Sequence, residues 1–353
     1  MSVPSLTSDC QFCSVVSKIN GEDPIGSANF CLGWLVMELP LPWTKERFDT
    51  DPLLQPIYQL LHTLFNQGIQ VMPLAIAPDR SYSTPGRSRV VYYQQPAAAF
   101  AQFEPQEFLL PSEQIINLVK ALLLDPAELP HFDAYRRPVQ AQRELMVCTH
   151  GNIDVACARF GQPVYQQLRR SYASIKDPGI AEGAGVNRDS LPMSASMRSA
   201  APLRVWRCSH FGGHQFAPTL IDFPLGQVWG HLELEILDAL VRRDRPVTEL
   251  RPFYRGWSAL GKFEQIVERE IWMERGWEWL TFHKSGQVLA QDGNHKTPHW
   301  AKVRIHFKSP EGQIQGSYEA SVEAKGEVMT AHYSGGAPVP ALQYQVSGLK
   351  QQD

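Results

Sequence analysis

The 353-residue sequence lacks several features that would assign it quickly to a class of protein. It contains no block of like charge, and a net charge of −3 at pH 7 argues against the basic surface that nucleic-acid binding requires. No run of about 18 apolar residues occurs, so we expect no membrane-spanning helix. Residues 1–9 carry neither the basic nor the apolar segment of a secretory signal, and we therefore expect a cytoplasmic protein.

Motifs for nucleotide binding and for glycoside hydrolysis are also missing. The sequence contains no Walker loop, and no Gly-rich dinucleotide fingerprint follows a predicted strand. No two carboxylates stand out as the pair that glycoside hydrolysis needs. We therefore expect no nicotinamide or nucleotide site in the chain itself.

Cysteine is scarce, with six residues in the chain and no spacing typical of a disulfide-rich secreted domain. Cys10 and Cys13 form a Cys-x-x-Cys pair, but they precede any strong strand, whereas a redox pair of the thioredoxin kind follows one. A thiol–disulfide function through Cys10 and Cys13 stays open as an alternative.

Hydrophobic periodicity predicts an α/β fold that begins with two tandem β-α-β-β-α units. In the first unit we expect strands at 33–39, 69–77 and 89–93, and helices at 52–65 and 112–124. In the second we expect strands at 145–148, 203–208, 219–223 and 226–230, and helices at 160–175 and 232–242. Two such units suggest a degenerate repeat of a thioredoxin-like half.

The last part of the chain has a different pattern. A helix at 257–274 precedes alternating segments separated by turn signals, which predict a small α+β region with an antiparallel meander. We therefore expect three domains, at 1–140, 141–245 and 246–353, and of the two β-α-β-β-α units only the second carries the ligand-type residues.

Four ligand-type residues stand in the second unit. Cys148 and Cys157 have eight residues between them, and His210 and His214 flank the pair Gly212 and Gly213. Zinc takes two cysteines and two histidines, but cysteines of structural zinc sites usually lie about two to four residues apart. A wider loop suits a binuclear iron–sulfur cluster, whose iron also accepts histidine. The glycines would let the backbone approach such a cluster closely. A zinc-stabilised binding module stays open as an alternative.

The order strand, C-x8-C, helix, strand, H-x-G-G-H resembles the sucrase/ferredoxin-like family over roughly residues 140–245. The run Gly-Glu-Asp-Pro-Ile-Gly at 21–26 also looks like the N-terminal part of bacterial relatives. The resemblance implies a thioredoxin-like ferredoxin domain that binds a [2Fe-2S] cluster. Carried over residue by residue, the ligands are Cys148, Cys157, His210 and His214.

An electron-transfer function follows from this resemblance. Two imidazoles in place of two thiolates make the cluster less negative, and by analogy with Rieske centres its potential should lie at about −150 to +300 mV. An imidazole whose other nitrogen reaches solvent can lose a proton, so we expect electron transfer coupled to protonation at His210 or His214. We expect the histidine edge to be the exposed one, and a redox partner protein to exchange electrons there.

Two other features are interpreted as unrelated to the cluster. Cys208 precedes His210 by two residues and is interpreted as a buried neighbour instead of a ligand. His295 and His299 repeat the H-x3-H spacing, but they lie in a polar turn without a nearby cysteine. We interpret that turn as a solvated loop.

Overall fold

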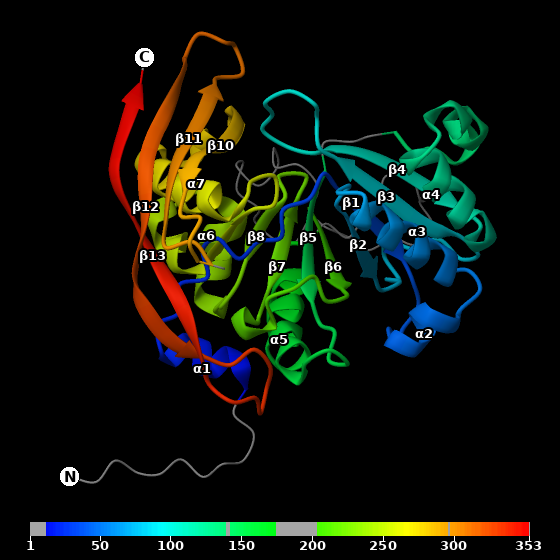
Figure 1. Ribbon diagram of the computed structural model, residues 1–353. Coiled ribbons are helices and arrows are strands. Elements are labelled where there is room, and N and C mark those ends of the chain that lie inside the picture. Colours follow the sequence, from blue (N-terminus) through cyan, green and yellow to red (C-terminus); the bar gives the residue numbers. More distant parts are fainter. Residues whose placement is uncertain (1–11, 139–141, 174–202, 296, 353) are drawn as a thin grey trace, which may run out of the picture.

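The computed structural model describes residues 12–138, 142–173, 203–295 and 297–352. These residues form a mixed α/β protein with one large mixed sheet and a separate antiparallel sheet of four strands (Figure 1). No helix among them is long and apolar enough to cross a membrane.

The first half of the large sheet consists of β1 (Gly33–Glu38), β2 (Val71–Ile76), β3 (Ser88–Gln94) and β4 (Glu104–Leu110). Helices α2 (Lys45–Thr50) and α3 (Gln55–Asn66) connect β1 to β2, and α4 (Ile115–Leu123) follows β4. Strand β1 pairs parallel with β2 and antiparallel with β3, which pairs antiparallel with β4. Every residue of β1 is buried, because Leu35 and Met37 face the core under α3 and α4 while Trp34 and Val36 face a second core.

The second half repeats this connectivity with β5 (Arg143–Cys148), β6 (Leu203–Cys208), β7 (Leu220–Phe223) and β8 (Gln227–Trp229). Helix α5 (Val155–Ser171) lies between β5 and β6 in the sequence, and α6 (Leu237–Arg242) follows β8. Strand β5 pairs parallel with β6 and antiparallel with β7, which pairs antiparallel with β8. A further strand, β9 (Tyr254–Trp257), adds antiparallel to β8.

The two halves join edge to edge into one sheet of nine described strands, in the order β4-β3-β1-β2-β6-β5-β7-β8-β9. The ladder between β2 and β6 is antiparallel and contains one residue pair, Ile76 and Cys208. Ser209 continues the junction, since its N–H donates to Ala75 O at 2.8 Å and its hydroxyl accepts from Ala75 N at 2.9 Å. The first half therefore borders the segment that leaves β6.

The C-terminal part contains α7 (Lys262–Arg275) and the antiparallel strands β10 (His283–Gln291), β11 (Trp300–Lys308), β12 (Gln315–Thr330) and β13 (Val339–Gln352). The predicted antiparallel meander is confirmed. Figure 1 shows this four-stranded sheet on the left of the molecule and the first half of the large sheet on the right. The N-terminal helix α1 (Cys13–Ile19) lies near α5, beneath the four-stranded sheet.

Three expectations from the sequence need correction. Strand β4 was not predicted, because Pro105 and several polar residues hide the strand pattern at the edge of the sheet. Helix α5 begins at Val155 instead of residue 160, because Asp154 caps it by accepting from Ala156 N. The stretch 257–274 is not one helix: β9 ends at Trp257, and α7 begins at Lys262. The division into three domains stays a prediction.

Candidate metal centre

Cys148 and Cys157 are brought together by the tight packing of α5 on the end of β5. Cys148 is the last residue of β5, and Cys157 lies in the first turn of α5. A Cβ on Gly161 would lie 2.0 Å from Cys148 O, so only glycine permits this approach of helix and strand. Both cysteine side chains are fully buried.

His210 follows β6 and is positioned by a second histidine. The backbone N–H of His210 donates to His150 Nδ1 at 3.2 Å, which fixes the proton of His150 on Nε2. That Nε2–H donates to Trp43 O at 2.5 Å. Burial lowers the pKa of His150, which keeps this imidazole neutral. His150 thus ties the His210 backbone to the loop that follows β1.

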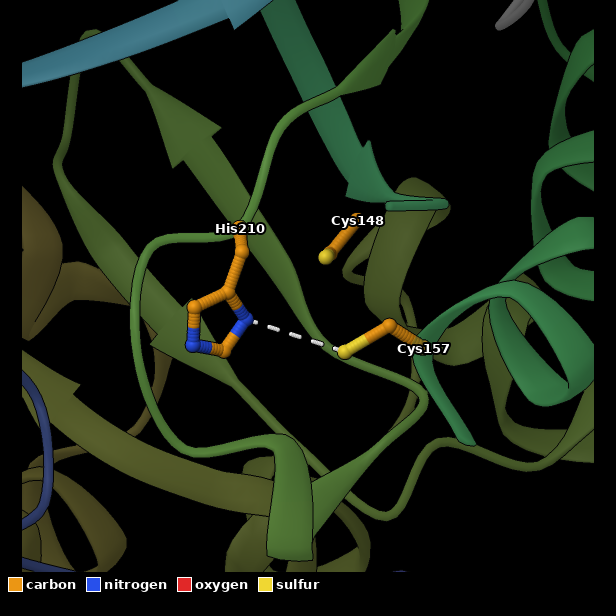
Figure 2. Close-up of side chains that lie close together, drawn as sticks. All are labelled: Cys148, Cys157 and His210. Atoms are coloured by element: carbon orange, nitrogen blue, oxygen red, sulfur yellow. Dashed lines mark hydrogen bonds between the residues drawn. The ribbon is translucent and has the colours of Figure 1, made fainter. Parts of the chain in front are cut away.

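Cys148, Cys157 and His210 form a group whose ligand atoms all lie within 4.8 Å of one another (Figure 2). Cys157 Sγ lies 3.7 Å from His210 Nδ1. Two ligands of a tetrahedral metal, with bonds of about 2.3 Å to sulfur and 2.05 Å to nitrogen, stand about 3.6 Å apart. The spacing between Cys157 and His210 therefore fits two ligands of one metal.

The two thiols influence each other's pKa in opposite directions. The hydrogen bond from Cys157, with the nearby His210 imidazole, holds the pKa of Cys148 well below its ordinary value. The same bond and burial raise the pKa of Cys157. The lowered pKa favours the thiolate of Cys148, and thiolate is the form of cysteine that binds metal.

His214 lies next to this group, in a short 3-10 helix at His214–Phe216. Its ring centroid is 5.3 Å from that of His210. Its Nδ1 lies 3.5 Å from Cys13 Sγ and 3.7 Å from Asp154 Oδ2, and these three residues form a second group of ligand-type side chains. The structure therefore brings all four predicted ligands into one region, together with Cys13 and Asp154.

Gly212 and Gly213 adopt φ angles of +95° and +72°, which are conformations that side chains disfavour. A Cβ on Gly213 would lie 2.2 Å from Nη2 of Arg255. The Arg255 guanidinium is buried and donates to Gly212 O at 3.0 Å and to Ser27 O at 2.7 Å. Burial lowers the pKa of Arg255 to about 10, which is still above neutral pH. A positive charge therefore lies beside the histidine loop, residues 210–214.

Ser334 closes the site from the C-terminal side, and no sequence pattern marks it. The Ser334 hydroxyl donates to Asp154 Oδ1 at 2.6 Å, and Ser334 N donates to Asp154 Oδ2 at 2.7 Å. Burial alone would raise the pKa of Asp154, but these bonds and the Ala156 N–H lower it. Asp154 was recognisable as a helix cap, whereas no local pattern marks Ser334.

The histidines form the more accessible edge of the site. Both cysteines are fully buried, while His210 and His214 are each half-buried. A groove of about 420 Å³ reaches His210 and Gly212 from the first half of the sheet. It is largely apolar and is lined by side chains such as Met37, Leu39, Phe48, Leu54, Ile57, Tyr58 and Leu61.

The five described cysteines are free thiols, and Cys10 lies outside the described residues. Cys208 pairs in register with Cys148 and is fully buried, which raises its pKa. His295 and His299 stack with ring centroids 4.0 Å apart, and His295 Nδ1 lies 2.5 Å from Asp292 Oδ2. Both histidines are exposed, as expected for a solvated loop, and their ligand-type atoms lie within 4.8 Å of one another and of Asp292.

Comparison with curated proteins and with solved structures found no match. The sequence model of the sucrase/ferredoxin-like family matches residues 24–256. This range covers more than half of the chain and contains Cys148, Cys157, His210 and His214, whereas Cys13 precedes it. The chain belongs to the sucrase/ferredoxin-like family.

Proposed function

We propose that the protein transfers electrons through a [2Fe-2S] cluster bound by Cys148, Cys157, His210 and His214. The observation that carries this proposal is the convergence of two buried thiols and two half-buried imidazoles from separate segments of the chain. When bound, such a cluster supplies one-electron redox chemistry.

The spread of the ligands supports a binuclear cluster over a single ion. Cys148, Cys157 and His210 are grouped closely, but His214 belongs to a second group, with Cys13 and Asp154. A tetrahedral ion needs all four donor atoms about 3.6 Å apart, whereas a binuclear cluster distributes its ligands over two irons. Zinc is the second candidate, because the 3.7 Å between Cys157 Sγ and His210 Nδ1 suits it equally well.

The sheet topology supports the thioredoxin-like interpretation of the two halves. In each, a parallel β-α-β pair is extended by two antiparallel strands on the side of its first strand, and a helix follows. We infer that the second half is the ferredoxin unit. The first half of the sheet would then pack beside the ferredoxin unit and form one wall of the groove beside His210.

The half-buried histidines give the chain a place to hold a proton during electron transfer. In each imidazole, the nitrogen that would not bind metal can carry a proton. Reduction would add negative charge nearby, which favours protonation of that nitrogen. The midpoint potential should therefore fall with rising pH. A potential that stays constant from about pH 6 to pH 10 contradicts coupling at His210 and His214.

The same edge is the proposed place of electron exchange with a redox partner protein. His210 and His214 are more exposed than the two cysteines, so a partner approaches the cluster most closely through them. We further propose the cytoplasm as the compartment, because the five described cysteines are free thiols, as a reducing environment keeps them.

Metal and sulfide analysis of anaerobically purified protein tests the proposal. Two irons and two acid-labile sulfides per chain are expected, and substitution of Cys148 by serine should abolish both. One zinc per chain without sulfide would select the zinc-stabilised binding module instead. Normal electron transfer by a Cys10→Ser, Cys13→Ser variant would eliminate the thiol–disulfide alternative.

A further inference from the structure

Cys13 is placed beside His214 by a hydrogen bond to Ser334, which is itself bonded to Asp154. It is the first residue of α1 and is fully buried. Its backbone N–H donates to Ser334 Oγ at 3.3 Å, and Ser334 is bonded in turn to Asp154 at the start of α5. The Cys13 thiol is thus held in place although α1 contains only seven residues.

The surroundings of the Cys13 thiol are those of a metal ligand. Its sulfur lies 3.5 Å from His214 Nδ1, close to the spacing of about 3.6 Å between two donors on one tetrahedral metal. Asp154 Oδ2 lies 3.7 Å from the same nitrogen. The Cys13 sulfur therefore lies within bonding reach of a metal that the His214 nitrogen binds.

We propose that Cys13 is a substitute ligand that can replace His214 on the cluster. The inference rests on the proposed function and adds a second ligation state to it. In the exchange, the iron–nitrogen bond to His214 breaks and an iron–sulfur bond to Cys13 forms. The thiol proton moves from Cys13 to the released imidazole, no electron is transferred, and Asp154 faces the resulting imidazolium.

The exchange has a definite electrochemical consequence. A third thiolate makes the cluster more negative, so the midpoint potential of the Cys13-ligated form lies below that of the His214-ligated form. The protein would thus hold its cluster at either of two potentials without a change in its overall proton count.

Anaerobic purification of four proteins tests the inference: the wild type, Cys13→Ser, His214→Ala and the double variant. His214→Ala should retain most of its iron and sulfide, with a lower potential. Pulsed EPR of its reduced form should detect one bound nitrogen instead of two. The double variant should lose the cluster, whereas Cys13→Ser should keep the wild-type spectrum. His214→Ala with Cys31→Ser is the matched control, because it removes another fully buried thiol, and it should behave as His214→Ala does.

The outcomes separate this inference from the proposed function. Loss of the cluster in His214→Ala as complete as in the double variant would overturn the substitute role of Cys13. So would a double variant that retains as much cluster as His214→Ala, or a Cys13→Ser variant that loses it. A wild-type protein without iron and sulfide would overturn the proposed function, and the inference with it. Far-UV circular dichroism of each variant establishes that it is folded.

Discussion

Substitution of Gly213 by alanine perturbs the loop that carries both histidines. The residue has φ +72°, and its Cβ would lie 2.2 Å from Nη2 and 2.5 Å from Cζ of Arg255. The guanidinium has little room to retreat, because it is buried and bonded to Gly212 and Ser27. We expect loss of stability and displacement of the adjacent His214.

The expected loss of stability in Gly213→Ala has two contributions. A left-handed conformation costs a non-glycine residue about 1–2 kcal/mol. Overpacking against a buried group adds about 1–3 kcal/mol, which gives a total of about 2–5 kcal/mol. Gly68→Ala is the matched control, because Gly68 has φ +82° and nothing within 4 Å of its Cβ position. That variant should lose only the first contribution, about 1–2 kcal/mol.

Urea unfolding of the metal-free proteins measures both values, and iron and sulfide analysis measures cluster retention. Gly213→Ala should be less stable than Gly68→Ala by about 1–3 kcal/mol and should lose cluster, whereas Gly68→Ala should keep it. Equal stability of the two variants would refute the role of Arg255 as the rigid support of the histidine loop.

Three further predictions concern the surroundings of the site and its ligands. His150→Ala removes the acceptor of His210 N and should cost about 1–3 kcal/mol in urea unfolding; Asn152→Ala should cost less, because His150 still donates to Trp43 O. Asp222→Asn leaves Arg143 and Arg243 without their buried carboxylate, at a cost of about 3 kcal/mol near pH 7. Burial raises the pKa of Asp222, but the two arginines outweigh this effect, so the pKa is lowered overall. The stabilisation by the ion pairs is therefore complete above about pH 3.9 and is lost as the pH falls further. The difference in the free energy of unfolding between wild type and Asp222→Asn should therefore become smaller at acidic pH. A difference that does not change with pH would contradict the ion pairs. His210→Cys should keep its cluster at a lower potential in voltammetry, and loss of the cluster would count against His210 as a ligand.

The fold was predictable where burial leaves a strong local pattern. The apolar run of β1 is visible because both faces of that strand are covered. Strand β4 was missed because an edge strand tolerates Pro105 and polar residues. The single residue pair that joins β2 to β6 is a tertiary contact that no local periodicity encodes.

The candidate site was predictable to the extent that its proposed ligands form a spacing pattern. The cysteine and histidine pairs identified four side chains, and the structure brings them into one region. The position of Cys13 beside His214 and the role of Ser334 were not predicted, because only tertiary packing brings α1 and the C-terminal segment to His214. His150 lies between Cys148 and Cys157 in the sequence. Its role in positioning His210 depends on a contact with Trp43 that the sequence does not reveal.

The central claim is that two thiolates and two imidazoles bind a [2Fe-2S] cluster. Pulsed EPR of the reduced, anaerobically purified wild-type protein tests it most directly, because it detects both the cluster and the nitrogens bound to it. We expect the signal of a binuclear cluster with two directly bound nitrogens, lost together with iron in Cys148→Ser. A cluster signal without bound nitrogen, or fully reduced protein without any cluster signal, would contradict the claim.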